Sequence, residues 1–73
     1  MSITTHTARI TGPVAYRSAS GRTVNIPLGP CVVERMDGPF TDIVWGSRGQ
    51  SCVALPSEAV QAAQDQGHLV LLD

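Results

Sequence analysis

Two strand-like runs, Cys31–Met36 and Phe40–Trp45, meet at a turn segment, Met36-Asp37-Gly38-Pro39. Both runs are rich in β-branched and aromatic residues, which favour extended backbone. Asp-Gly tolerates the positive φ angles of a tight turn, whereas β-branched neighbours do not adopt them. The pattern therefore predicts an antiparallel hairpin, and with it a mostly β domain.

The register of this hairpin decides which side chains share a face. A two- or four-residue loop places Glu34 opposite Thr41, whereas a three-residue loop places Glu34 opposite Asp42. Because two carboxylates directly across a strand pair repel each other, we expect the first register, in which Arg35 lies opposite Phe40.

In that register the hairpin has apolar residues on both faces. The predicted core face consists of Val32, Met36, Ile43 and Trp45. The predicted second face mixes apolar and charged side chains and consists of Val33, Arg35, Phe40, Asp42 and Val44. A chain this small must then curl its sheet into a barrel or cover the second face with a partner.

Shorter patterned runs precede the hairpin. Residues Thr5–Arg17 form a strand-like run that Gly12 and Pro13 interrupt, so we expect two short strands or one strongly bent strand. Ser18–Gly21 is a polar turn. Residues Thr23–Leu28 then alternate apolar and polar positions, which is typical of a half-buried strand.

After the hairpin, the spacing of apolar residues changes from that of a strand to that of a helix. A short apolar strand, Cys52–Leu55, is followed by a helix of about ten residues, with Ser57 as the N-cap and Glu58 in the first turn. Gly67 lies where a glycine commonly follows a helix. The final run, His68–Leu72, has consecutive apolar residues, which indicates a strand buried on both faces or between subunits.

The order of these elements resembles that of the SH3-like small barrels. The resemblance rests on residues Thr23–Leu72: the Asp-Gly hairpin, the strand Ile43-Val44-Trp45, and Val53-Ala54-Leu55-Pro56 leading into a helix before the last strand. It implies a small SH3-like barrel or curled antiparallel sheet of five to six short strands, with one short helix before the last strand. We expect a single small domain over residues 1–73, frayed over residues 1–5.

One family in that superfold, the plasmid-borne trimethoprim-insensitive dihydrofolate reductases, has similarly short chains that assemble several barrels around a shared pore. Its pore segment, Val-Gln-Ile-Tyr before a proline, is similar in position to Cys52–Leu55 before Pro56. The Gln and Tyr that hold the cofactor and folate are absent here. The resemblance therefore implies oligomeric assembly, and no cofactor.

Composition narrows the possible partners and compartments. The chain has five arginines, no lysine and a net charge of -1, which argues against a general polyanion binder. Its start has no basic segment followed by an apolar run, and its longest apolar stretch is Leu69–Leu72. We therefore expect a cytoplasmic protein without a membrane span. Cys31 and Cys52 are then expected to be reduced, buried thiols, and not a disulfide or half of a metal site.

Few residues have the spacing that catalysis or metal binding requires. His6 and His68 could approach each other if the first and last strands pair, but no carboxylate or thiol lies at ligand spacing from them. No serine lies in a Gly-x-Ser-x-Gly turn, and no base is placed to activate one. We predict no catalytic residue, no metal, no cofactor and no enzymatic activity.

The second face of the hairpin is the leading candidate for function. Burial of Val33, Phe40 and Val44, with Arg35 and Asp42 at the rim, would hold a partner. This predicts a module that forms a homo-oligomer, binds another protein, or does both.

The arginines provide the alternative. A four-residue loop at Ser18–Gly21 would place Arg17 opposite Arg22, a repulsive pair that a bound anion would stabilise. With Arg48 as a third cation, these residues could bind nucleic acid or a phosphoanion. That function requires the three side chains on one side of the domain and binding that weakens with salt.

Overall fold

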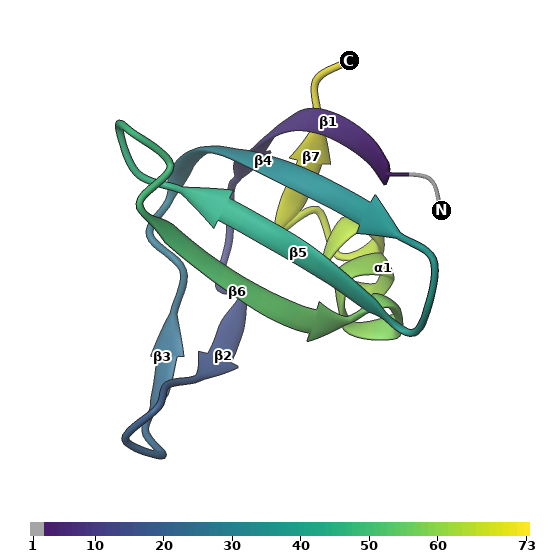
Figure 1. The fold of residues 1–73 in the computed structure, drawn as a ribbon. Coiled ribbons are helices and arrows are strands. Elements are labelled where there is room, and N and C mark those ends of the chain that lie inside the picture. The colour runs from purple at the N-terminus through teal and green to yellow at the C-terminus, as the bar shows by residue number, and fades with distance from the viewer. Residues whose placement is uncertain (1–2) are drawn as a thin grey trace.

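A curled antiparallel sheet forms most of the molecule, and a helix and the base of a separate hairpin pack against its inner side (Figure 1). The computed structural model describes residues 3–73. The strands are β1 (Ile3–Ile10), β2 (Ala15–Arg17), β3 (Thr23–Asn25), β4 (Gly29–Met36), β5 (Phe40–Trp45), β6 (Ser51–Pro56) and β7 (Leu69–Leu71), with the helix α1 (Ser57–Asp65) before β7. The predicted fold class, mostly β with a short helix before the last strand, is confirmed.

The main sheet has five strands in the order β6-β5-β4-β1-β7, and β2 and β3 form a separate two-stranded sheet. All the strand pairs are antiparallel. Strands β6 and β7 are the two edges, so the sheet curls but does not close.

The N-terminal strand is longer than the sequence indicates. Ile3 pairs with Met36, and the ladder continues to the pair of Ile10 with Gly29. The prediction of a frayed end is therefore wrong for residues 3–5, and residues 1–2 lie outside the described residues. The interruption at Gly12 and Pro13 separates β1 from β2, as predicted.

The predicted register of the β4–β5 hairpin is wrong. Glu34 lies opposite Asp42 and Val33 opposite Ile43, across a three-residue loop in which Gly38 has a φ of 120°. A like-charge pair of this kind costs at most about 1 kcal/mol. Burial of a Val or Ile side chain contributes about 1.5–3 kcal/mol. Either register buries one β4 valine beside Ile43, so the choice is made where β4 pairs with β1. There Cys31 lies opposite the buried Ala8, which puts Val33 on the inner side.

The core lies between the inner side of the sheet and the elements that cover it. The buried sheet residues are Ala8, Ile10, Cys31, Val33, Ile43, Leu55 and Leu69. From the other side, Val14 and Ile26 at the base of the β2–β3 hairpin and Val60 and Ala63 of α1 complete the core. A helix of nine residues is too short to be stable alone, so this packing holds it in place.

The ends of α1 match the prediction only in part. Gly67 has the positive φ, 77°, that a glycine after a helix adopts, and Glu58 lies in the first turn, as predicted. Ser57 is the first helical residue and makes no cap. Its hydroxyl instead lies 2.8 Å from the hydroxyl of Thr41, which ties the helix start to β5.

Three expectations about burial are wrong. Within the chain the last strand is not buried on both faces, because Val70 is 42% exposed, and the alternative of burial between subunits stays a prediction. The alternating run of β3 does not bury its apolar members together, since Val24 and Leu28 are exposed while Ile26 is buried. Cys31 is a buried free thiol, as expected, but Cys52 is exposed. Val70 and Cys52 lie on the side of the main sheet that faces away from the core, whereas Val24 and Leu28 lie outside that sheet.

Candidate functional site

The structure separates the five residues predicted to form one interface. Val33 has no exposed surface and belongs to the core. Arg35 is on the inner side of β4, where its guanidinium donates a hydrogen bond of 2.9 Å to the Gln64 side chain of α1. The one-residue difference in register moves every β4 side chain to the opposite face. Only Phe40, Asp42 and Val44 remain together on the side of the sheet that faces away from the core.

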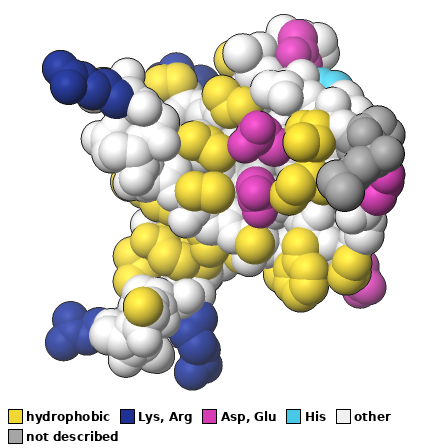
Figure 2. Space-filling model, in the orientation of Figure 1, with side chains coloured by type: hydrophobic (Ala, Val, Ile, Leu, Met, Phe, Trp, Pro, Cys, Tyr) yellow, Lys and Arg dark blue, Asp and Glu magenta, His cyan; other side chains and the backbone are white. Residues whose placement is uncertain are grey.

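That side of the three strands is the candidate surface, and we call it the outer face. It consists of Val32, Glu34, Met36, Phe40, Asp42, Val44, Cys52 and Ala54. Figure 2 shows hydrophobic side chains over this side of the molecule with acidic side chains among them. Phe40 is 50% exposed and Met36 is 37% exposed. An apolar surface of this kind on a small domain is typical of an interaction site.

Glu34 and Asp42 lie directly opposite each other in the middle of the outer face. Within residues 3–73, neither forms an ion pair. Burial raises the pKa of the nearby Cys52 thiol, and the negative charges of Asp42 and Glu34 raise it further. The outer face therefore carries a local negative potential, and its thiol is a weak nucleophile at neutral pH.

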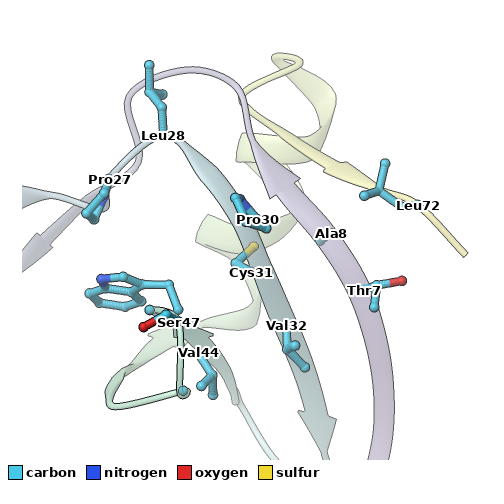
Figure 3. A pocket seen from close by; sticks show the side chains of 13 residues that line it. Thr7, Ala8, Pro27, Leu28, Pro30, Cys31, Val32, Val44, Ser47 and Leu72 are labelled. Carbon is cyan, nitrogen blue, oxygen red and sulfur yellow. The ribbon is translucent and has the colours of Figure 1, made fainter.

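An apolar hollow continues the outer face toward the end of β5. Its volume is about 730 Å³. The hydrophobic side chains that border it include Leu28, Pro30, Val32, Val44 and Leu72 (Figure 3). Its polar members among the described residues are the hydroxyl residues Thr7 and Ser47. The lining offers apolar contact and no charged group to a ligand.

The β2–β3 hairpin projects from the sheet, and we call residues 15–25 the arm (Figure 1). Its base is fixed to the body of the domain. The Ile26 amide donates a 2.9 Å hydrogen bond to the Val14 carbonyl, and both side chains are buried. The Tyr16 and Trp45 rings also pack, with centroids 5.7 Å apart. The arm is thus a fixed projection with an exposed tip.

The tip of the arm does not place Arg17 opposite Arg22, so that prediction is wrong. Arg17 pairs with Thr23. The Ser18 amide donates a 2.8 Å hydrogen bond to the Arg22 carbonyl, which places Ser18 across from Arg22. Because neighbouring residues of a strand alternate sides, the two guanidinium groups start from opposite sides of the arm and the expected repulsion is relieved.

Arg48 does not join these two arginines. It lies in the β5–β6 loop, whose position in Figure 1 is at the opposite end of the molecule from the tip of the arm. Its backbone amide donates a 2.9 Å hydrogen bond to the Gln50 side chain. The three cations therefore do not form one cluster.

The two histidines also lie apart. His6 Nδ1 is 3.0 Å from Asp73 Oδ1, and this hydrogen bond, together with one from the Thr7 amide, lowers the pKa of Asp73. The His68 carbonyl instead accepts a 2.8 Å hydrogen bond from the Thr11 amide, five residues and about 16 Å further along the chain from His6. Among residues 3–73, no group of three His, Cys, Asp or Glu side chains could hold a metal ion.

Comparisons of this chain with protein-family models, with curated proteins and with solved structures gave no match. Within residues 3–73, α1 is the single helix, and it lacks the length and apolar character needed to cross a bilayer.

Proposed function

We propose that this chain is a non-enzymatic cytoplasmic module of the SH3-like small-barrel type that self-associates and binds protein through its outer face. The observation that supports this most strongly is the unneutralised pair of Glu34 and Asp42 within an exposed apolar surface. A partner that covers Phe40 and Val44 while bringing a cation to the two carboxylates would satisfy both features.

The energetics favour such a partner. The paired carboxylates destabilise the isolated chain by about 0.2–1 kcal/mol, and a guanidinium beside them would remove that repulsion. The hydrophobic side chains of the face add burial at about 25 cal/mol for each Å² covered. Apolar contact thus supplies affinity, and the carboxylates select a basic partner.

The domain is large enough to carry such an interface. Its accessible surface is 4762 Å². A standard interface covers about 800 Å² on each partner, which would be roughly one-sixth of that surface. The outer face and the hollow beside it form one continuous area because they share Val32 and Val44.

Binding of nucleic acid or a phosphoanion is the alternative. It would use Arg17 and Arg22 at the tip of the arm, with Arg48 at the other end of the molecule. The separation of Arg48 from the other two leaves at most two neighbouring cations. No contact within residues 3–73 favours an anion at the tip, so this alternative is second to protein binding.

A matched pair of alanines tests the proposed function. Ala54 lies on the outer face opposite Asp42, whereas Ala62 is an exposed residue of α1. Ala54→Arg would supply from within the chain the cation that a partner brings, and its side chain would obstruct the face. We expect it to lower self-association about tenfold or more while Ala62→Arg leaves it unchanged, as measured by light scattering over a dilution series.

Circular dichroism spectra equal to that of the unmodified chain would show that both variants are folded. Equal association of the two variants would contradict a role for the outer face. A single-chain mass for the unmodified protein at every concentration would contradict self-association.

A further inference from the structure

The arm carries a basic and an apolar side chain on one of its two sides. Arg22 lies across from Ser18, and Val24 lies across from Tyr16, so alternation puts Arg22 and Val24 on the same side. Arg17 starts from the other side. Tyr16 shares the side of Arg22 and Val24 and packs on Trp45 of its own chain at the base of the arm. Nearer the tip, Arg22 and Val24 are exposed, Val24 at 37%.

The outer face repeats the same spacing with the opposite charge. Asp42 and Val44 are two residues apart on one side of β5, as Arg22 and Val24 are on the arm. Two residues of extended chain span about 6.6 Å in both places. The paired residues of β4 continue the pattern with a second carboxylate and a second valine. A strand carrying Arg22 and Val24 therefore matches the outer face in charge, polarity and period.

The arm cannot make this contact within its own chain. Its base is held by the buried side chains of Val14 and Ile26 and by the ring pair of Tyr16 and Trp45. In Figure 2 the basic side chains at the end of the arm lie well away from the acidic side chains in the middle of the sheet. The complementary surfaces are thus both exposed and separated in one molecule.

We propose that the arm of one chain docks on the outer face of a second copy, with Arg22 against Glu34 and Asp42 and Val24 against Val32 and Val44. In the proposed arrangement a two-fold axis relates the two copies, so that each arm lies on the outer face of the other copy and the assembly closes as a dimer. This inference rests on the proposed function and names its partner.

Charge reversal of the arm tests the contact. Arg22→Glu would place a carboxylate against two others. We expect it to raise the dimer dissociation constant by about tenfold or more. Arg48→Glu makes the same change in net charge at the other end of the molecule and should leave the constant unchanged. Arg17→Glu should have a smaller effect than Arg22→Glu, because its side chain starts from the other side of the arm.

A mixing experiment makes the test specific. The double variant Glu34→Arg with Asp42→Arg keeps a like-charge pair on the outer face but reverses its sign, so it should repel its own arm. Arg22→Glu should be weakened for the converse reason. In a mixture, each arm meets an outer face of opposite charge, so we expect a mixed dimer although each variant alone is monomeric. Native mass spectrometry distinguishes it from either homodimer.

The outcomes separate this inference from the function on which it rests. A mixed dimer supports arm docking. An oligomer that Arg22→Glu leaves as stable as the unmodified protein overturns arm docking but leaves self-association through the outer face standing. Two variants that are monomeric alone and in the mixture also overturn arm docking. A monomeric unmodified chain overturns both.

Discussion

The two faces of the β4–β5 hairpin both carry apolar side chains, but one face is buried in the core and the other is exposed. On the inner side, Val33 and Ile43 lie opposite each other and have no exposed surface. The neighbouring pair, Val32 and Val44, also lie opposite each other, but on the outer face, where both are only partly buried. The helix and the base of the arm cover the first pair. Nothing within residues 3–73 covers the second.

The polar residues of the two faces differ in the same way. On the inner side, Thr41 is buried but shares a 2.8 Å hydrogen bond with Ser57, and Arg35 has the Gln64 side chain as its partner. On the outer face, Glu34 and Asp42 face each other without a cation among the described residues. The polar groups of the inner face are thus paired within one chain, whereas the two carboxylates of the outer face have no cation partner within residues 3–73.

Truncation of one valine or isoleucine on each face should reveal this difference most strongly. Ile43→Ala removes buried methyl groups from the core and should lower the free energy of unfolding by about 2–5 kcal/mol. Val44→Ala, at the next position on the outer face, should lower it by less than about 1 kcal/mol. Urea unfolding at a concentration where the chain is monomeric provides the measurement. If both variants lost the same free energy of unfolding, the outer face would be part of the core.

Neutralising the acidic pair should change the free energy of unfolding by less than the core truncation does, and should raise it. Glu34→Gln or Asp42→Asn removes the cross-strand repulsion and should stabilise the monomer by about 0.2–1 kcal/mol while weakening self-association. The same changes should lower the pKa of Cys52, because both carboxylates raise it. At a fixed neutral pH the thiolate fraction then increases, so alkylation of Cys52 should be faster.

Cys31 provides the control within the same molecule, since it is buried and should stay unreactive in the folded chain. Unchanged alkylation of Cys52 together with lower stability would contradict the assignment of Glu34 and Asp42 as an unneutralised pair.

The sequence predicts the elements of this fold better than their registers. The turn at Asp37 and Gly38, the helix ending before Gly67 and the interruption at Gly12 and Pro13 all follow from local chemistry and are confirmed. Local patterns are reliable here because proline fixes φ and glycine alone readily adopts the positive φ that Gly38 and Gly67 have, whatever surrounds them.

The register of β4 and β5 depends on a third strand that the hairpin sequence does not reveal. β4 also pairs with β1, where the buried Ala8 and Ile10 are two residues apart and fix the inner side of the sheet. The rule against like-charge pairs fails because the repulsion of Glu34 and Asp42 costs at most about 1 kcal/mol, too little to override the side of β4 that its pairing with β1 turns inward. The sequence therefore identifies the outer face only in part, through Phe40, Asp42 and Val44.

The position of the arm could not be predicted from the sequence. Its turn is recognisable at Ser18–Gly21, but the hydrogen bond from the Ser18 amide to the Arg22 carbonyl shifts the ladder by one residue. Whether Arg17 and Arg22 share a side depends on that register, which all the pairs of the β2–β3 ladder share. The separation of Arg48 from both depends on long-range packing, which no local pattern of residues specifies.

The solution mass of the unmodified chain and of Phe40→Asp, measured by light scattering at low and high salt, tests the outer face most directly. Phe40 is exposed on that face, so its replacement removes apolar contact without removing any core residue. We predict that the unmodified chain forms a closed oligomer that apolar contact sustains at high salt, and that Phe40→Asp is a folded monomer. An unmodified chain that is monomeric at high concentration, or a variant that associates equally well, would contradict a role for the outer face in assembly.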